Sequence, residues 1–118
     1  PFAAGFNLSA AALAAASAAL DDKPFYKKSI EYNQLSKKIL VDTLNELELA
    51  HIPSDANFVL HEIGTPLADY AQHMQQNGVR VGRKMTQDDR WNRISLGTPD
   101  EMTIFSQTLK AFRQEGWV

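Results

Sequence analysis

The end of the chain carries the sequence feature that most constrains the fold, a strand pattern that leads directly into a capped helix. Residues 98–101 (Thr-Pro-Asp-Glu) have the spacing of a capping box, with proline at the first helical position. Apolar residues then recur at helical spacing up to Gly116, which fits the position after a helix end. In residues 91–97 apolar and polar residues alternate, which is typical of a half-buried strand. The chain therefore combines both element types.

Two helices are predicted before the first strand. Residues 8–20 are rich in alanine, the best helix former, and Asn7 or Ser9 can cap their start. Residues 21–24 (Asp-Asp-Lys-Pro) are a helix-start signal. Apolar residues at helical spacing then predict one long helix over residues 24–49, which ends before the next proline.

The middle of the chain predicts two further strands and one more helix. Residues 51–56 are a loop, and residues 57–63 are a strand that ends at a Gly-Thr-Pro turn. The next helix has Thr65 as its N-cap and ends near Gly78. Residues 79–83 form a second, short strand. This order of elements predicts an α+β fold, with a small, mostly antiparallel three-stranded sheet and helices packed on one of its faces.

Length, charge and hydropathy exclude several classes of protein. A chain of 118 residues forms one domain, and 44% hydrophobic with 22% charged residues is ordinary for a globular protein. The net charge of −2 and the lack of a basic stripe argue against nucleic-acid binding. No apolar run approaches the ~20 residues that span a membrane, and without cysteine there is no disulfide or thiolate site. We therefore expect a cytoplasmic protein with no nucleic-acid or membrane partner.

Arg93 is the strongest candidate for a ligand-binding residue. It lies in the middle of a predicted strand, on the face opposite Ile94 and Leu96. A charged side chain there must meet an anion or reach solvent, because an unpaired buried charge is costly. Its planar guanidinium suits a carboxylate or phosphate bound through two parallel hydrogen bonds. The alternative is an exposed arginine paired with an acid such as Glu62, and spacing alone favours this alternative.

Arg83 is a second candidate, because it ends the neighbouring predicted strand. A hairpin of the two strands would bring it near Arg93, and the two guanidinium groups would then bind one anion; a solvated loop charge is the simpler interpretation. The three histidines lack the spacing of a metal pair, and His61 is expected at the surface. No serine, carboxylate pair or glycine loop has a catalytic or phosphate-binding context, so we predict no catalytic residue and no metal site.

Three runs of sequence resemble a known enzyme family. Residues 53–60, 78–83 and 91–102, in this order, resemble the C-terminal part of fold-type I pyridoxal-phosphate-dependent aminotransferases, most closely the histidinol-phosphate aminotransferase-like enzymes. The start of the chain, residues 6–9 followed by the alanine-rich helix and two aspartates, is similar to the linker helix between the two domains of these enzymes. The resemblance covers essentially the whole chain.

This resemblance implies a domain organisation and roles for the two arginines. Residues 1–118 would be an aminotransferase C-terminal small domain, with residues 1–22 as the interdomain linker helix and residues 23–118 as the domain body. Arg93 would match the arginine that grips the carboxylate or phosphate group of the substrate. Arg83 would match the second arginine on the substrate side, so both are predicted to be substrate-binding.

The resemblance also implies what the chain lacks. The family binds pyridoxal 5'-phosphate through a Schiff-base lysine of the large domain, and the pair Ser36-Lys37 does not match that motif. We therefore expect a fragment of a longer, homodimeric aminotransferase whose large domain is missing, in keeping with a chain that starts without methionine. The parent would use an amino-acid or amino-phosphate substrate and a 2-oxo acid. The chain alone would bind no cofactor and would be inactive.

Two functions of other classes stay open. One is a stand-alone small-molecule-binding or regulatory domain without catalysis, which would bind its anionic ligand through Arg93. The other is a structural or interaction module that docks through the alanine-rich surface of residues 10–19.

Overall fold

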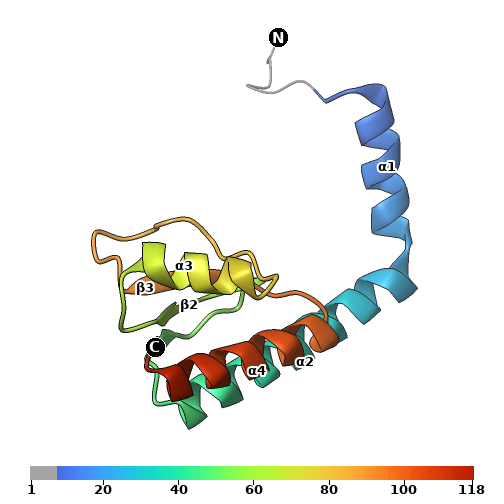
Figure 1. The fold of residues 1–118 in the computed structure, drawn as a ribbon. Coiled ribbons are helices and arrows are strands. Elements are labelled where there is room, and N and C mark those ends of the chain that lie inside the picture. The colour runs from blue at the N-terminus through green and yellow to red at the C-terminus, as the bar shows by residue number, and fades with distance from the viewer. Residues whose placement is uncertain (1–7) are drawn as a thin grey trace. The chain divides into compact units, whose positions relative to one another are not determined.

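The computed structural model describes residues 8–118 (Figure 1). The chain divides into two compact units, Pro1–Glu31 and Tyr32–Val118, and each is described by itself. The cap candidate Asn7 and the first residues of the linker motif lie outside the described residues.

Helices α1 (Ala10–Asp21) and α2 (Lys23–Glu46) confirm the two predicted N-terminal helices. The Ser9 hydroxyl caps α1 by accepting a hydrogen bond from a backbone N–H of the first turn at 3.1 Å. Asp22 does the same for α2, where its carboxylate accepts a backbone N–H at 3.1 Å. Helix α1 contributes no buried residue, so its stability rests on alanine propensity and its caps.

The turn after α2 corrects two boundaries. The predicted helix end at residue 49 was wrong, because Glu48 adopts a left-handed φ of 55° and the helix stops at Glu46. His51–Ile52, predicted as part of a loop, is the short strand β1, which pairs with β2 (Phe58–Glu62). Pairing with a distant segment, rather than a local apolar pattern, makes β1 a strand.

The α+β class and the three-stranded antiparallel sheet are confirmed. The strand order is β1-β2-β3, where β3 is Trp91–Ser95, and both pairs are antiparallel. The predicted strand over residues 79–83 was wrong, and β1 takes its place as the third strand. The predicted alternation is present, because Val79 and Val81 pack against the core while Arg80 and Arg83 are exposed, but the segment is not a strand of the sheet.

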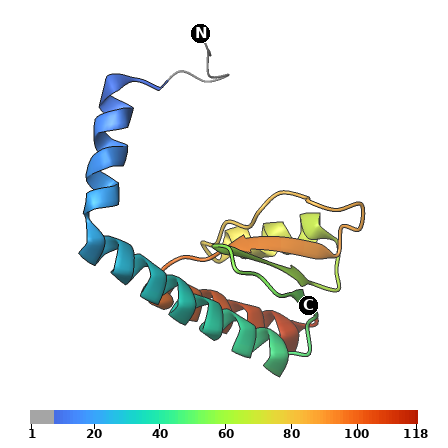
Figure 2. The same cartoon turned by 180° about the vertical axis from the view of Figure 1, so that it is seen from behind.

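The core forms where α2, α3 (Leu67–Gln76) and α4 (Pro99–Glu115) pack against one face of the sheet. In Figure 1 helix α3 lies in front of β3, and in the reverse view of Figure 2 the strand lies in front, so this helix covers one side of the sheet. The core residues, of which Leu49 and Ile63 lie just outside these elements, are Leu40, Leu44, Leu49, Val59, Ile63, Leu67, Tyr70, Met74, Ile94, Met102, Phe105, Leu109 and Phe112. The opposite face of the sheet, which we call the open face, is only half-buried.

The helix ends show which local signals were reliable. Thr98 and Glu101 form the predicted capping box at the start of α4, and Gly116 ends that helix with a left-handed φ of 76°. The predicted N-cap Thr65 was wrong, because α3 has no side-chain cap. The Thr65 hydroxyl instead donates a hydrogen bond to the carbonyl of Trp117 at 3.0 Å.

His61 and Asn92 form a buried polar pair in the core. They are direct cross-strand partners and both are fully buried, so the expected surface position of His61 was wrong. His61 Nδ1 donates a hydrogen bond to the Glu62 carbonyl at 2.9 Å, whereas Nε2 and the Asn92 amide have no partner within residues 8–118. Burial lowers the pKa of His61 to about 4, because the charged imidazolium would lose its hydration; the Glu62 bond opposes this shift and His51 adds to it.

We predict that acid destabilises the protein through His61. Its folded-state pKa of about 4 lies below the ordinary 6.5, so stability present above pH 6.5 is lost as the pH falls toward 4. The free energy of unfolding should fall by about 2 kcal/mol between pH 7 and pH 5 through this group. Urea unfolding at both pH values should show that this part of the loss is absent from His61→Gln and mostly retained in His51→Gln, because His51 adds only a minor part of the shift. The same pH dependence in His61→Gln and wild type would contradict the assignment.

Candidate anion-binding site

Arg93 lies in the middle of β3 on the open face of the sheet, as the alternation predicted. It is half-buried and pairs across the sheet with Leu60 of β2. Two other β2 residues on the same face, Phe58 and Glu62, are its diagonal neighbours, within reach of a long side chain. The guanidinium carbon lies 4.3 Å from the centroid of the Phe58 ring. The arginine therefore stacks on the aromatic neighbour.

No acid within residues 8–118 neutralises Arg93, so the pairing with Glu62 that spacing alone favoured is not formed. Its Nε is buried and has no hydrogen-bond partner there either. Two other arginines are engaged, Arg90 by Asp88 and Arg113 by the carbonyls of Leu47 and Val118. Arg93 thus keeps an unneutralised charge on a planar donor group, which is the chemistry that binds a carboxylate or phosphate.

The segment over residues 79–83 lies beside β3 although it is not a strand. A Cβ atom at Gly82 would overlap with the carbonyl oxygen of Arg93, so only glycine allows this close approach of two backbones. Arg83 follows directly and is exposed. The structure therefore brings the backbones of the two predicted site residues together. Within the described residues no interaction joins the guanidinium groups of Arg83 and Arg93.

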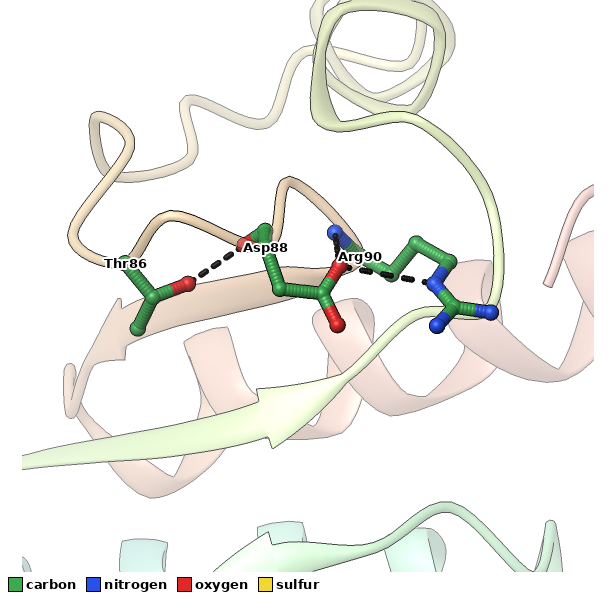
Figure 3. A network of polar contacts seen from close by, with 3 residues as sticks. All are labelled: Thr86, Asp88 and Arg90. Carbon is green, nitrogen blue, oxygen red and sulfur yellow. Dashed lines mark hydrogen bonds and ion pairs between the residues drawn. The ribbon is translucent and has the colours of Figure 1, made fainter.

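Hydrogen bonds among Thr86, Asp88 and Arg90 link residues within the loop between this segment and β3 (Figure 3). The Asp88 carboxylate accepts hydrogen bonds from the backbone N–H of Arg90 at 2.9 Å and from its Nε at 3.4 Å. The Thr86 hydroxyl donates to the Asp88 carbonyl. These bonds to Arg90, the backbone one above all, lower the pKa of Asp88. The Asp88 carboxylate is therefore paired with Arg90, the residue that directly precedes β3.

A surface cavity of about 300 Å³ lies at the end of β3, where Ile94 and Ser95 line it. It is bounded by residues 78–80, by Ile94 from the covered face, and by Met102 and Phe105 of α4. Neither Arg93 nor Arg83 lines it. The candidate site is therefore the open sheet face itself and not this cavity.

The serine of the pair Ser36-Lys37 is used within the fold itself. The pair Ser36-Lys37 lies in the middle of α2, as predicted. The Ser36 hydroxyl is fully buried and donates a hydrogen bond to the carbonyl of Gly97 at 2.8 Å. This serine joins α2 to the turn before α4, so its role is structural.

Two other kinds of site are absent from residues 8–118. These residues hold no group of three or more acids or histidines arranged for a metal ion. None of their helices is long and apolar enough to span a membrane.

Comparison with known proteins relates almost the whole chain to one family. The family model described as "Aminotransferase class I and II" matches residues 1–109. The histidinol-phosphate aminotransferase of Symbiobacterium thermophilum is 33% identical over 114 residues, which cover 94% of this chain and 31% of that protein. A histidinol-phosphate aminotransferase of Pasteurella multocida is 39% identical over 102 residues, which cover 85% of this chain and 28% of that protein.

Solved structures show the same fold. A putative histidinol-phosphate aminotransferase from Erwinia carotovora atroseptica matches with a TM-score of 0.85 and 42% identity, over 88% of this chain and 30% of that one. The histidinol-phosphate aminotransferase from Sinorhizobium meliloti, solved in complex with pyridoxal-5'-phosphate, matches with a TM-score of 0.68 at 24% identity, over 86% of this chain and 30% of that one. The chain thus spans about 30% of the length of the relatives it matches, and its fold is that of the aminotransferase small domain.

The close approach at Gly82 makes a testable prediction. Gly82→Ala should lower the free energy of unfolding by about 1–3 kcal/mol, because the added Cβ meets backbone that must move. Gln87→Ala, in the exposed part of the adjoining loop, should stay within about 0.5 kcal/mol of wild type. Urea unfolding measures both variants. Wild-type stability in Gly82→Ala would mean that this segment does not lie against β3.

Proposed function

Because the chain belongs to the aminotransferase class I and II family, we propose that it is the C-terminal small domain of a longer pyridoxal-phosphate-dependent aminotransferase. We propose that residues 1–22 are the interdomain linker and residues 23–118 the domain body; α2 starts at Lys23, which supports this boundary, whereas the division into compact units falls later, within α2 between Glu31 and Tyr32. The substrate class proposed is an amino acid or amino phosphate such as histidinol phosphate, with a 2-oxo acid as amino acceptor. The named relatives support this class.

The observation that carries the proposal is the unneutralised Arg93 on the open face. Its guanidinium would bind the carboxylate or phosphate group of the substrate through two charge-assisted hydrogen bonds. Fixing this end of the substrate orients its amine toward the reaction centre, which contributes to rate by positioning. Arg83, exposed beside β3, would contact a second anionic group or the same one from the other side.

In this proposal the rest of the longer protein holds the cofactor. Bound pyridoxal phosphate supplies an electron sink for the bond changes at the substrate amine. The residues of this chain bind and orient the substrate anion, and they move no proton. The 118-residue chain alone would therefore not transaminate. The longer protein is proposed to be a homodimer, as the family resemblance implies.

A second candidate function is anion binding by the chain on its own, without catalysis. One observation favours it: Arg93, its aromatic neighbour Phe58 and the segment at Gly82 that lies close to the Arg93 backbone all belong to this chain. Calorimetric titration of the chain with inorganic phosphate distinguishes the two. Binding that Arg93→Ala abolishes favours the stand-alone domain, whereas no binding favours a site completed by other parts of a longer protein.

The aminotransferase proposal predicts a separation of substrate binding from cofactor loading. In the longer protein, Arg93→Lys should reduce kcat/KM for the amino donor by roughly 10- to 100-fold, because lysine cannot form the two parallel bonds. The absorbance of the bound cofactor should not change. Arg80→Lys, an exposed arginine of the neighbouring segment, is the control and should behave as wild type. Loss of cofactor absorbance in Arg93→Lys, or turnover by the 118-residue chain with added pyridoxal phosphate, would contradict the proposal.

A further inference from the structure

We propose that Phe58 is a positioning residue for the anion site: its ring fixes the guanidinium plane of Arg93, so that the two terminal nitrogens meet the substrate anion end-on. The inference rests on the proposed function of Arg93 as the substrate-binding arginine. It adds a residue that acts through Arg93, and it names the edge of the guanidinium that binds.

The register of β2 and β3 places the Phe58 ring beside Arg93. Leu60 stands directly opposite Arg93, so Phe58 and Glu62, each two residues from Leu60, are the diagonal neighbours of Arg93 on the same face. An acid would normally attract the arginine, yet the guanidinium lies over the Phe58 ring at 4.3 Å and forms no ion pair with Glu62. A ring attracts a cation through its quadrupole without neutralising it. The stack therefore orders a flexible side chain and leaves its charge available to a ligand.

The burial of Nε decides which edge of the guanidinium is free. A carboxylate or phosphate can bind side-on, to Nε and one terminal nitrogen, or end-on, to both terminal nitrogens. The Nε atom of Arg93 is buried and has no hydrogen-bond partner within residues 8–118, whereas the terminal nitrogens are not among the buried unpartnered atoms. A ligand cannot reach Nε without displacing the groups that cover it. The end-on edge is therefore the binding edge.

The proposal makes a prediction that does not depend on catalysis. In the 118-residue chain, the NMR signal of the Arg93 Nε–H should exchange slowly with water, and the adjacent CH₂ protons should be shifted by the ring current of Phe58. Phe58→Leu keeps an apolar side chain but removes the ring and its ring-current shift, so the informative result is the Arg93 Nε–H, which should exchange faster than in wild type. Phe58→Tyr should keep both signatures. Glu62→Gln changes the other diagonal neighbour and should also keep both.

The second readout is the kinetics of the longer protein. Phe58→Leu should raise KM for the amino donor about five- to tenfold with kcat within twofold of wild type, because the anion must then order Arg93 itself. Phe58→Tyr should restore KM, and Glu62→Gln should leave it within twofold. Wild-type exchange of the Arg93 Nε–H or a wild-type KM in Phe58→Leu would overturn the positioning role.

The failure of this inference can be told apart from failure of the proposed function. If Arg93→Lys leaves KM and kcat unchanged, Arg93 does not bind the substrate and the proposed function fails, whatever the NMR signatures of Phe58→Leu show. If Arg93→Lys weakens substrate use but Phe58→Leu does not, the proposed function stands and the role of Phe58 fails.

Discussion

The antiparallel register of β2 and β3 is the constraint on which both the core and the candidate anion site depend. Pairing Leu60 with Arg93 turns Ile94 toward the helices and Arg93 toward the open face. A slip by one residue would exchange these two faces, placing the arginine charge in the core and Ile94 outside. Burying an unpaired charge costs far more than exposing one aliphatic side chain. The charge of Arg93 therefore specifies the register at least as strongly as the apolar residues do.

The two faces of this sheet treat polar side chains in opposite ways. On the covered face, His61 and Asn92 are fully buried, and burial keeps the imidazole neutral near neutral pH. On the open face, the guanidinium of Arg93 lies over an aromatic ring, which attracts a cation without neutralising it. One sheet thus holds a buried polar pair on one face and an unneutralised arginine on the other, separated only by strand alternation.

Local interactions were predictable from the sequence, and distant ones were not. The capping box at residues 98–101 and the end of α4 at Gly116 involve neighbours within one turn, so their signals are complete in the sequence. The face on which Arg93 lies followed from alternation alone. Thr65 was assigned wrongly because its hydroxyl prefers a carbonyl far away in the chain. Phe58 was missed for the same reason, since only the cross-strand register, which one sequence does not reveal, makes it a neighbour of Arg93.

Holding an arginine by a ring rather than by a carboxylate suits a site that another part of a protein completes. An internal ion pair would have to break before a substrate anion could bind, and the substrate would compete with the protein's own acid. A ring orients the same guanidinium and offers no competing anion. The chain spans about 30% of the length of its relatives, and on the proposed function the chemistry at the substrate amine lies in the remaining part. A prearranged, unneutralised arginine is then what the small domain must supply, because the anion it receives is brought by the substrate and not by the fold.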